Sequence, residues 1–245
     1  MARSPEATGA IRASFGVGLA VAAYGVSFGA LAVTAGLDIV QTCVLSLLMF
    51  SGGSQFAVIG ILASGGAAAG PAAIASAALL GTRNSLYAIT MAPILAERWP
   101  KRLLAAHWTI DESTAVAMAQ STMEAKRTGF WWTGIIIFLG WNLTTLFGAL
   151  LGDLIGDVSQ YGLDAAAAAA FLGLLWPRLK QLQPIVVAVA AAVIAALLTP
   201  ALPAGLPVLL AALVAVIVGI TNWFSPRGRA AGTSLDPSAP NGSVS

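Results

Sequence analysis

The chain has 245 residues, of which 58% are hydrophobic and only 9% are charged, and its formal net charge is +2. A soluble domain of this size carries charges on roughly a quarter of its residues, so the composition excludes an ordinary soluble domain and favours a protein embedded in a bilayer. The small net charge gives no sign of nucleic-acid binding. The single cysteine, Cys43, excludes a CxxC metal or redox site.

Eight apolar segments follow one another along the chain. The first would be about 33 Å long as a helix, enough to cross a hydrocarbon core of about 30 Å. We predict an all-α fold, a polytopic transmembrane helix bundle with seven or eight apolar segments, some of them broken or re-entrant. The eight segments are 14–35, 39–63, 71–95, 103–122, 129–152, 163–177, 184–200 and 204–224.

The predicted domain organisation has three parts. Residues 1–13 are polar and show no short apolar core followed by a cleavage site, so we interpret them as a retained cytoplasmic tail. Residues 14–224 are predicted to form one transmembrane domain. Residues 225–245 are too polar to bury apolar surface and are predicted to be a disordered tail.

Orientation signals agree in the second half of the chain and conflict in the first. Cytoplasmic loops are enriched in Lys and Arg, which places the basic residues at 126–127 and 178–180 on the cytoplasmic side. Three crossings from a cytoplasmic N-terminus would leave the basic stretch 97–102 outside. Three alternatives stay open: segment 103–122 crosses the membrane, segment 39–63 is re-entrant at its glycines, or the N-terminus is outside. Segment 103–122 either crosses or lies re-entrant.

Three charged residues lie inside apolar segments: Arg83, Asp111 and Glu112. A charge at bilayer depth costs about 2.5–3.5 kcal/mol on insertion scales, so such residues persist where they face protein or a water-filled cavity. The functional interpretation is a substrate or ion pathway. The alternatives are an ion pair that locks two helices, or a solvated helix for the two acids. His107 lies four residues before Asp111, which on one helix would make a proton relay conceivable.

The run Ser51-Gly52-Gly53-Ser54-Gln55 interrupts the second segment. Each glycine weakens a helix by about 1 kcal/mol relative to alanine, and the freed backbone groups must meet protein, water or ligand. Transporters use broken helices to hold a substrate carboxylate at a half-helix N-terminus. Close packing of helices through small residues is the alternative. It is the preferred interpretation of the GxxxG spacings at 25–29 and 148–152.

Motifs for nucleotide or metal chemistry are absent, because the chain has no Walker, Rossmann or HExxH pattern. We therefore expect no enzyme activity, no cofactor and no metal. The pair Asp111-Glu112 could resemble a carboxylate dyad, but a single histidine and the lack of a Gly-x-Gly-Asp run argue against an intramembrane enzyme. Energy for transport must come from a gradient, a partner or the substrate itself.

Four motifs in order resemble the AzlC-type branched-chain amino acid permeases, and the resemblance covers about residues 10–225. They are YGVSFGALAVTAGL at 24–37, FSGGSQFA at 50–57, RNSLY at 83–87 and the pair Asp111-Glu112. The chain differs from the usual family pattern at Gly81, where the family often has Asn, and at Asn84, where it often has His.

The resemblance implies a secondary transporter that exports leucine, isoleucine, valine and in some members methionine, with a small AzlD-type membrane subunit as partner. A multi-pass protein of the bacterial cytoplasmic (inner) membrane is expected. The rivals are a channel or facilitator for another small solute, and an assembly subunit that acts only with its partner.

A zwitterionic substrate needs a carboxylate site and an ammonium site. We expect the backbone N–H groups around residues 52–55, or Arg83, to receive the carboxylate, and Asp111 or Glu112 to face the ammonium or to carry a coupling proton. The apolar neighbours expected to receive a branched side chain are Phe50, Phe56 and Met49. The residues predicted to bind substrate are Gly52, Gly53, Ser54, Gln55, Arg83, Asn84, Asp111 and Glu112.

Overall fold

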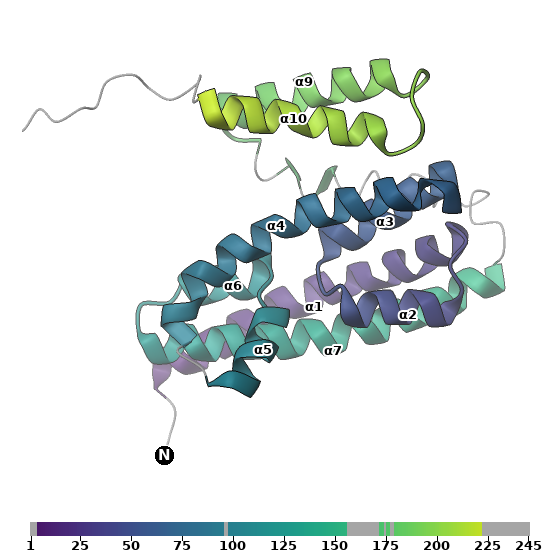
Figure 1. Cartoon of the computed structure of the whole chain (residues 1–245). Helices are drawn as coiled ribbons and strands as arrows, with labels where there is room; N and C mark the ends of the chain where they lie inside the picture. The colour runs from purple at the N-terminus through teal and green to yellow at the C-terminus, as the bar shows by residue number, and fades with distance from the viewer. Residues whose placement is uncertain (1–3, 96–97, 156–171, 174, 177–178, 222–245) are drawn as a thin grey trace, which may run out of the picture.

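The computed structural model describes residues 4–95, 98–155, 172–173, 175–176 and 179–221 (Figure 1). Every element in these residues is a helix, which confirms the all-α prediction. The helices are α1 (Pro5–Thr34), α2 (Ile39–Leu48), α3 (Gly52–Gly65), the 3-10 turn η1 (Ala67–Ala69), α4 (Gly70–Leu95), α5 (Trp99–His107), α6 (Asp111–Met118), α7 (Met123–Ile155), α9 (Leu182–Leu198) and α10 (Leu206–Thr221).

By length and composition, α1 and α7 are apolar and long enough to cross a membrane. Three further apolar helices, α2, α9 and α10, are shorter. The predicted count of seven or eight apolar segments is therefore not confirmed. Most of segment 163–177 and the whole tail 225–245 lie outside the described residues. α1 begins at Pro5, where the Ser4 hydroxyl accepts from the Ala7 N–H, so much of the predicted tail 1–13 is helical.

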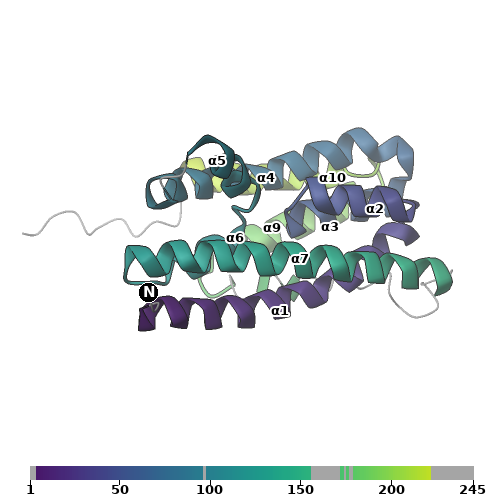
Figure 2. The same ribbon diagram turned by 90° about the horizontal axis from the view of Figure 1, so that it is seen from below.

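The helices α1 and α7 lie side by side and run in the same direction (Figure 2). Glycines set their close approach: a Cβ at Gly29 would collide with the carbonyl oxygen of Thr145, and one at Gly148 with the carbonyl oxygen of Val26. Further along the pair, the buried Thr133 hydroxyl donates to the Ser14 hydroxyl at 2.9 Å. Small residues at a helix–helix contact allow the two backbones to approach closely. This contact confirms the packing interpretation of the GxxxG spacings at 25–29 and 148–152.

The second apolar segment is broken into α2 and α3 by Met49, Phe50 and Ser51. Asp38 begins α2 with a reciprocal capping box to Gln41, so α2 starts sharply. The break falls just before the two glycines, which form the first turn of α3. α3 then packs antiparallel to α4, where the Ser54 hydroxyl donates to the carbonyl oxygen of Ala77 at 3.0 Å. α2 and α3 thus form a hairpin that enters the bundle and turns back (Figure 1).

The fourth apolar segment is also broken. α5 has 9 residues and α6 has 8, which is about 14 Å and 12 Å of helix, so neither can cross a bilayer core of about 30 Å. Residues 108–110 separate them, and the Ser113 hydroxyl closes this break by accepting from the Ile110 N–H and donating to the Trp108 carbonyl. The break between α5 and α6 fits the re-entrant alternative for segment 103–122, because one continuous helix across this segment is not present.

Two hairpins consequently enter the bundle from opposite ends. α1 leads to α2–α3, and α4, running the other way, leads to α5–α6 (Figure 1). The side chain of Arg127 at the start of α7 donates to the carbonyl oxygen of Ile94 at the end of α4, at 2.7 Å, which ties the two termini together. A long helix followed by a hairpin, used twice in opposite directions, is the kind of inverted arrangement found in secondary transporters.

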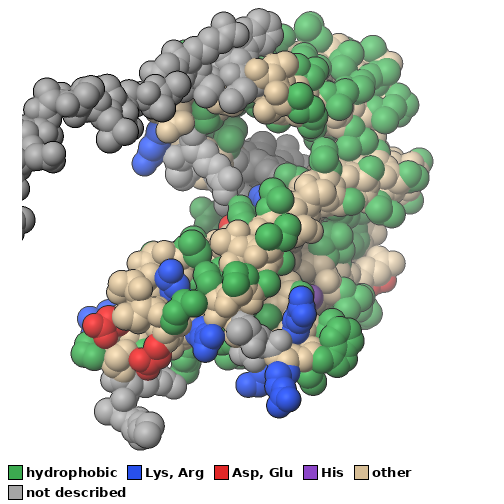
Figure 3. All heavy atoms as spheres, turned by 60° about the vertical axis from the view of Figure 1, so that its left-hand side comes forward, with side chains coloured by type: hydrophobic (Ala, Val, Ile, Leu, Met, Phe, Trp, Pro, Cys, Tyr) green, Lys and Arg blue, Asp and Glu red, His purple; other side chains and the backbone are tan. Residues whose placement is uncertain are grey.

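The basic residues gather at the end of the bundle where α1 begins. Figure 3 shows Lys and Arg side chains clustered in the lower part of the molecule. Because α2–α3 turns back and α4 returns, the basic stretch 98–102 lies at the same end as the N-terminus. This supports the re-entrant alternative for segment 39–63 and removes the conflict in the orientation signals. This end of the bundle holds the start of α1, the end of α4, α5 and the start of α7. The basic residues described there are Arg12, Arg98, Lys101, Arg102, Lys126 and Arg127.

Large apolar side chains cover the outside of the bundle. On α7, Leu139, Leu143 and Phe147 are 56%, 67% and 56% exposed. Continuous apolar surface of this kind is unfavourable in water and suits the hydrocarbon of a bilayer, where helices satisfy their own backbone groups. α9 and α10 form an antiparallel apolar pair packed at the far side of α4 (Figure 1).

Candidate functional site

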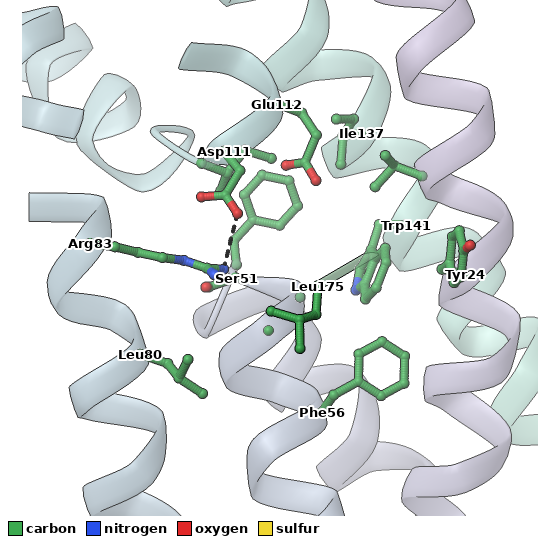
Figure 4. A pocket seen from close by; sticks show the side chains of 15 residues that line it. Tyr24, Ser51, Phe56, Leu80, Arg83, Asp111, Glu112, Ile137, Trp141 and Leu175 are labelled. Atoms are coloured by element: carbon green, nitrogen blue, oxygen red, sulfur yellow. Dashed lines mark ion pairs between the residues drawn. The ribbon is translucent and has the colours of Figure 1, made fainter. Parts of the chain in front are cut away.

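A cavity of about 310 Å³ lies where the tips of the two hairpins meet. Figure 4 shows the charged side chains of α4 and α6 facing the start of α3, with aromatic rings on the other side. The volume is at the lower end of the range of about 300–1,000 Å³ for small-molecule sites. The lining residues are Val21, Tyr24, Phe50, Ser51, Gly52, Gly53, Phe56, Leu80, Arg83, Ile110, Asp111, Glu112, Ile137, Trp141 and Leu175.

The first turn of α3 contributes backbone rather than side chains. Gly52 and Gly53 are the first two helical residues, and the N-cap residue Ser51 makes no side-chain capping hydrogen bond. The first N–H groups of a helix have no partner within it, and the helix dipole places partial positive charge there. The wall formed by Gly52 and Gly53 is therefore suited to receive an anionic group.

Arg83 lies next to this turn. A Cβ at Gly53 would be 2.9 Å from Arg83 Nη2, so the guanidinium can pack over the start of α3 only because residue 53 is glycine. Arg83 Nη2 also lies 3.4 Å from Asp111 Oδ2, an ion pair between α4 and α6 (dashed in Figure 4). The Arg83 Nε atom is buried and has no hydrogen-bond partner among the described residues.

The start of α6 contributes the two acids. Asp111 and Glu112 occupy its first turn, where the helix dipole stabilises negative charge. With all three charged side chains ionised, the lining residues carry one positive and two negative charges. The ion pair is 31% and 24% exposed on its two side chains, so a polar ligand in the cavity can compete for either partner.

The remaining wall is apolar and rigid. Trp141 stacks on Phe28 with ring centroids 6.0 Å apart, and the edge of Phe56 meets Trp141 at an interplanar angle of 87°. Aromatic pairs in these geometries stabilise a packed core beyond the area that they bury. Tyr24, Phe56 and Trp141 lie across the cavity from Arg83 (Figure 4), so the cavity suits a small molecule with a charged end and an apolar end.

Five of the eight predicted binding residues line this cavity: Gly52, Gly53, Arg83, Asp111 and Glu112. They come from three helices that are far apart in the sequence. The three charged residues that were predicted to cluster, because they lie inside apolar segments, are therefore neighbours in the structure. The ion pair also fits the alternative in which Arg83 and Asp111 lock two helices, because both roles require the same contact.

The other three residues predicted to bind substrate do not line the cavity: Ser54, Gln55 and Asn84. Ser54 is 2% exposed and ties α3 to α4. Gln55 is fully buried, and its amide donates to the carbonyl oxygens of Met49 and Ser46 across the break. Asn84 neighbours Arg83 on α4, with a buried Oδ1 atom that no described residue contacts by a hydrogen bond.

His107 is placed differently from the relay hypothesis. It is the last residue of α5, whereas Asp111 begins α6 after a break, so the two do not share a helix face. The His107 ring instead lies against Phe50 and Phe138, with centroids 5.7 Å and 5.8 Å away. The spacing argument for a proton relay between His107 and Asp111 is therefore wrong.

The aromatic wall agrees in part with reasoning from sequence. Phe50 and Phe56, two of the three residues expected to receive a branched side chain, line the cavity, whereas the third, Met49, does not. Trp141 and Tyr24 were missed. Trp141 lies in the middle of an apolar segment, whereas tryptophan in membrane proteins is enriched at the interfaces, and that position was the available signal. Tyr24 gave no comparable signal, because aromatic residues in apolar helices usually pack in the core.

Comparison with known proteins places the chain in a family. Residues 16–155 match the family model described as AzlC protein, and this range contains both hairpins, Arg83 and the two acids. The chain is 32% identical over 169 residues to an uncharacterised membrane protein of Archaeoglobus fulgidus, covering 68% of this chain and 73% of that protein. No solved structure matches the chain. These similarities indicate a membrane protein with a transport function. The chain belongs to the AzlC protein family.

Proposed function

We propose that the protein is a secondary transporter that exports the branched-chain amino acids leucine, isoleucine and valine, together with the unbranched methionine, across the bacterial cytoplasmic membrane. The observation that carries the proposal is the Arg83–Asp111 ion pair, held at 3.4 Å beside the uncapped start of α3 in a cavity with an apolar far wall. A zwitterion with an apolar side chain complements each part of that cavity.

Each group of the substrate has a matching wall. The carboxylate would lie at Gly52 and Gly53, where backbone N–H groups and the Arg83 guanidinium converge. The ammonium would face Asp111 or Glu112, and the acid that it leaves free could carry a coupling proton. The branched side chain would lie against Phe56 and Trp141, with Leu80 on the opposite side of the cavity (Figure 4).

The hairpin arrangement supports transport rather than catalysis. α1, α4 and α7 have 30, 26 and 33 residues, which is about 39–50 Å of helix and more than a bilayer core. We propose that these three cross the membrane, that α9 and α10 form a further apolar pair, and that the two hairpins enter and return. A site between hairpins from opposite sides could be opened to either side by moving one hairpin at a time.

The partner is also part of the proposal. The family resemblance implies a small AzlD-type membrane subunit, and the exposed apolar faces of the helices would accommodate such a neighbour as readily as lipid. We therefore expect transport to require both chains.

The test is efflux of labelled leucine from preloaded right-side-out vesicles of cells that express this chain with and without an AzlD-type partner. Efflux that needs both chains and collapses with an uncoupler is the expected result. Efflux that is unaffected by the uncoupler would favour a channel or facilitator. Absence of leucine efflux, with both proteins present in the membrane, would refute the branched-chain assignment.

A further inference from the structure

The first turns of α5 carry large apolar and basic side chains together on the surface. Trp99 is 73% exposed and Leu103 is 56% exposed, and residues four apart on a helix share one face. The basic side chains of Lys101 and Arg102 lie between them in the sequence and are exposed as well. Hydrocarbon suits the first two side chains and water suits the other two, so this part of α5 suits the boundary between bilayer and water.

α5 is attached to the bundle near its end rather than at its start. Ala105 is its buried residue, and it packs in one cluster with Ile94 of α4 and Phe130 of α7. Two residues correspond to about 200° around an α-helix, so Leu103 points away from the bundle. The face of Trp99 and Leu103 is therefore turned outward, where lipid surrounds a membrane protein.

The cations at the start of α5 have no acidic partner among the described residues. The side chains of Arg98, Lys101 and Arg102 make no ion pair and no hydrogen bond with another described residue. Glu97 lies outside the described residues, and the stretch 97–102 holds three basic residues against this one acid. Like charges this close repel one another, so the stretch favours an anion supplied from outside the chain.

The start of α5 lies at the basic end of the bundle. Arg127 at the start of α7 donates to the carbonyl oxygen of Ile94, four residues before Arg98, so α5 begins where α4 ends and α7 starts. At such helix ends tryptophan is enriched, and Lys and Arg side chains extend to the headgroups. Figure 3 shows Lys and Arg side chains beside hydrophobic ones in the lower part of the molecule. The cations of α5 are therefore placed to meet lipid phosphates.

The two kinds of side chain define the chemistry of the ligand. A guanidinium donates two parallel hydrogen bonds to a phosphate, and an ammonium adds a point charge. A zwitterionic phospholipid brings its own cation beside the phosphate, which Lys101 and Arg102 would repel, whereas an anionic phospholipid brings none. A free phosphate would use the cations but not the apolar face of Trp99 and Leu103. The surface thus favours an anionic headgroup on an apolar body.

We propose that Arg98, Trp99, Lys101 and Arg102 bind an anionic phospholipid in the leaflet that the basic end of the bundle faces. None of these residues lines the cavity, so the lipid site is separate from the candidate transport site and does not depend on which solute the cavity takes. Because α5 and α6 form one hairpin, a lipid bound at α5 also holds the hairpin that carries Asp111.

The test is native mass spectrometry of the purified full-length chain in detergent, titrated with phosphatidylglycerol or phosphatidylcholine of the same acyl chains. The unaltered chain should bind phosphatidylglycerol more tightly. Each basic residue near an anionic lipid contributes roughly 5-fold in affinity. Replacing Lys101→Gln together with Arg102→Gln should therefore weaken phosphatidylglycerol binding about 25-fold and change phosphatidylcholine binding little.

Arg12→Gln together with Lys126→Gln is the matched control. It removes two charges from the same end of the bundle, but from α1 and α7, and should leave most of the preference for phosphatidylglycerol in place. Trp99→Ala is a second probe of the same surface. It removes apolar contact but no charge, so it should weaken the binding of both lipids by the same factor.

The outcomes separate a site from a general attraction. A lost preference for phosphatidylglycerol in the α5 double variant, with the preference kept in the control, supports the inference. An equal loss in both double variants overturns it, because the effect then reports the net charge of this end. Equal affinity of the unaltered chain for the two lipids also overturns it. Displacement of phosphatidylglycerol by an equal concentration of glycerol phosphate would show that the headgroup alone is bound and would overturn the lipid as the ligand.

Discussion

The side-chain amide of Gln55 donates a 2.6 Å hydrogen bond to the backbone carbonyl of Met49 and a longer one, at 3.3 Å, to that of Ser46. One buried side chain therefore joins the first turn of α3 to the last turn of α2, across the break that forms the cavity wall. The last carbonyl groups of a helix have no N–H donors within that helix. The Gln55 side-chain amide provides a donor to two such carbonyl groups at the end of α2.

Replacing Gln55→Leu should destabilise the protein by about 1–3 kcal/mol, because the carbonyl oxygen of Ser46 loses its buried Gln55 donor and that of Met49 keeps only the Ser51 N–H. The midpoint of thermal unfolding in detergent should fall by about 2–10 °C. Gln120→Leu is the control, since the Gln120 amide donates only to Val116 on a partly exposed turn. Equal midpoints for the Gln55 and Gln120 variants would contradict the bridging role.

Gly29→Ala should weaken the packing of α1 on α7. The new Cβ would collide with the backbone of Thr145 and Ala149, and backbone cannot move aside as a flexible side chain can. We expect a loss of about 1–3 kcal/mol, the usual cost of overpacking, measured as a lower unfolding midpoint. Gly16→Ala, on the same helix with no atom within 4 Å of the new Cβ, should be neutral or slightly stabilising. A neutral result at Gly29 would argue against the close helix contact.

Gly53→Ala should damage transport more than stability. Its Cβ would lie 2.9 Å from Arg83 Nη2, which is the end of a flexible side chain, so the guanidinium shifts away from the start of α3. We expect leucine efflux to fall about 10-fold with an unfolding midpoint close to that of the unaltered chain. Gly81→Ala is the matched control, because its nearest contact would be Ser54 Oγ at 3.8 Å. Efflux that responds equally to both changes would refute the positioning of Arg83.

Asp111→Asn and Glu112→Gln should each reduce efflux at least about 10-fold, because the amides can no longer attract an ammonium group or carry a coupling proton. Stability should change by less than about 1 kcal/mol for Asp111→Asn, since partly exposed ion pairs contribute little and the two side chains here are 31% and 24% exposed. Protein level and unfolding midpoint are measured alongside efflux. Full activity in both variants would show that the acids do not form the site.

The two ends of the bundle should face opposite sides of the membrane. In a Cys43→Ala background, Lys101→Cys reports on the basic end and Asp153→Cys on the end where α7 stops; both positions are exposed. A membrane-impermeant maleimide should label Asp153→Cys in intact cells and Lys101→Cys only after the membrane is opened. Labelling of both from the same side would refute the crossing of α7, and the reverse pattern would place the N-terminus outside.

The sequence by itself determined the helical class, the break near residues 51–55 and the choice of Arg83, Asp111 and Glu112 as candidate site residues. The physical reason is that these properties are local or depend only on burial: apolar runs favour helices in a bilayer, adjacent glycines weaken a helix, and a charge in an apolar run needs compensation. Each could be inferred without knowing which segments are neighbours.

Only the tertiary structure decided that segments 39–63 and 103–122 turn back, and which polar residues face the cavity. Hydropathy is the same for a segment that crosses and for one that returns, so the direction after a break depends on the helices against which it packs. Gln55 was predicted to bind substrate, but its side chain instead bridges the break between α2 and α3. Trp141 is held at the cavity by its packing on Phe28. A residue type fixes which hydrogen bonds are available, and the packed fold fixes where they point.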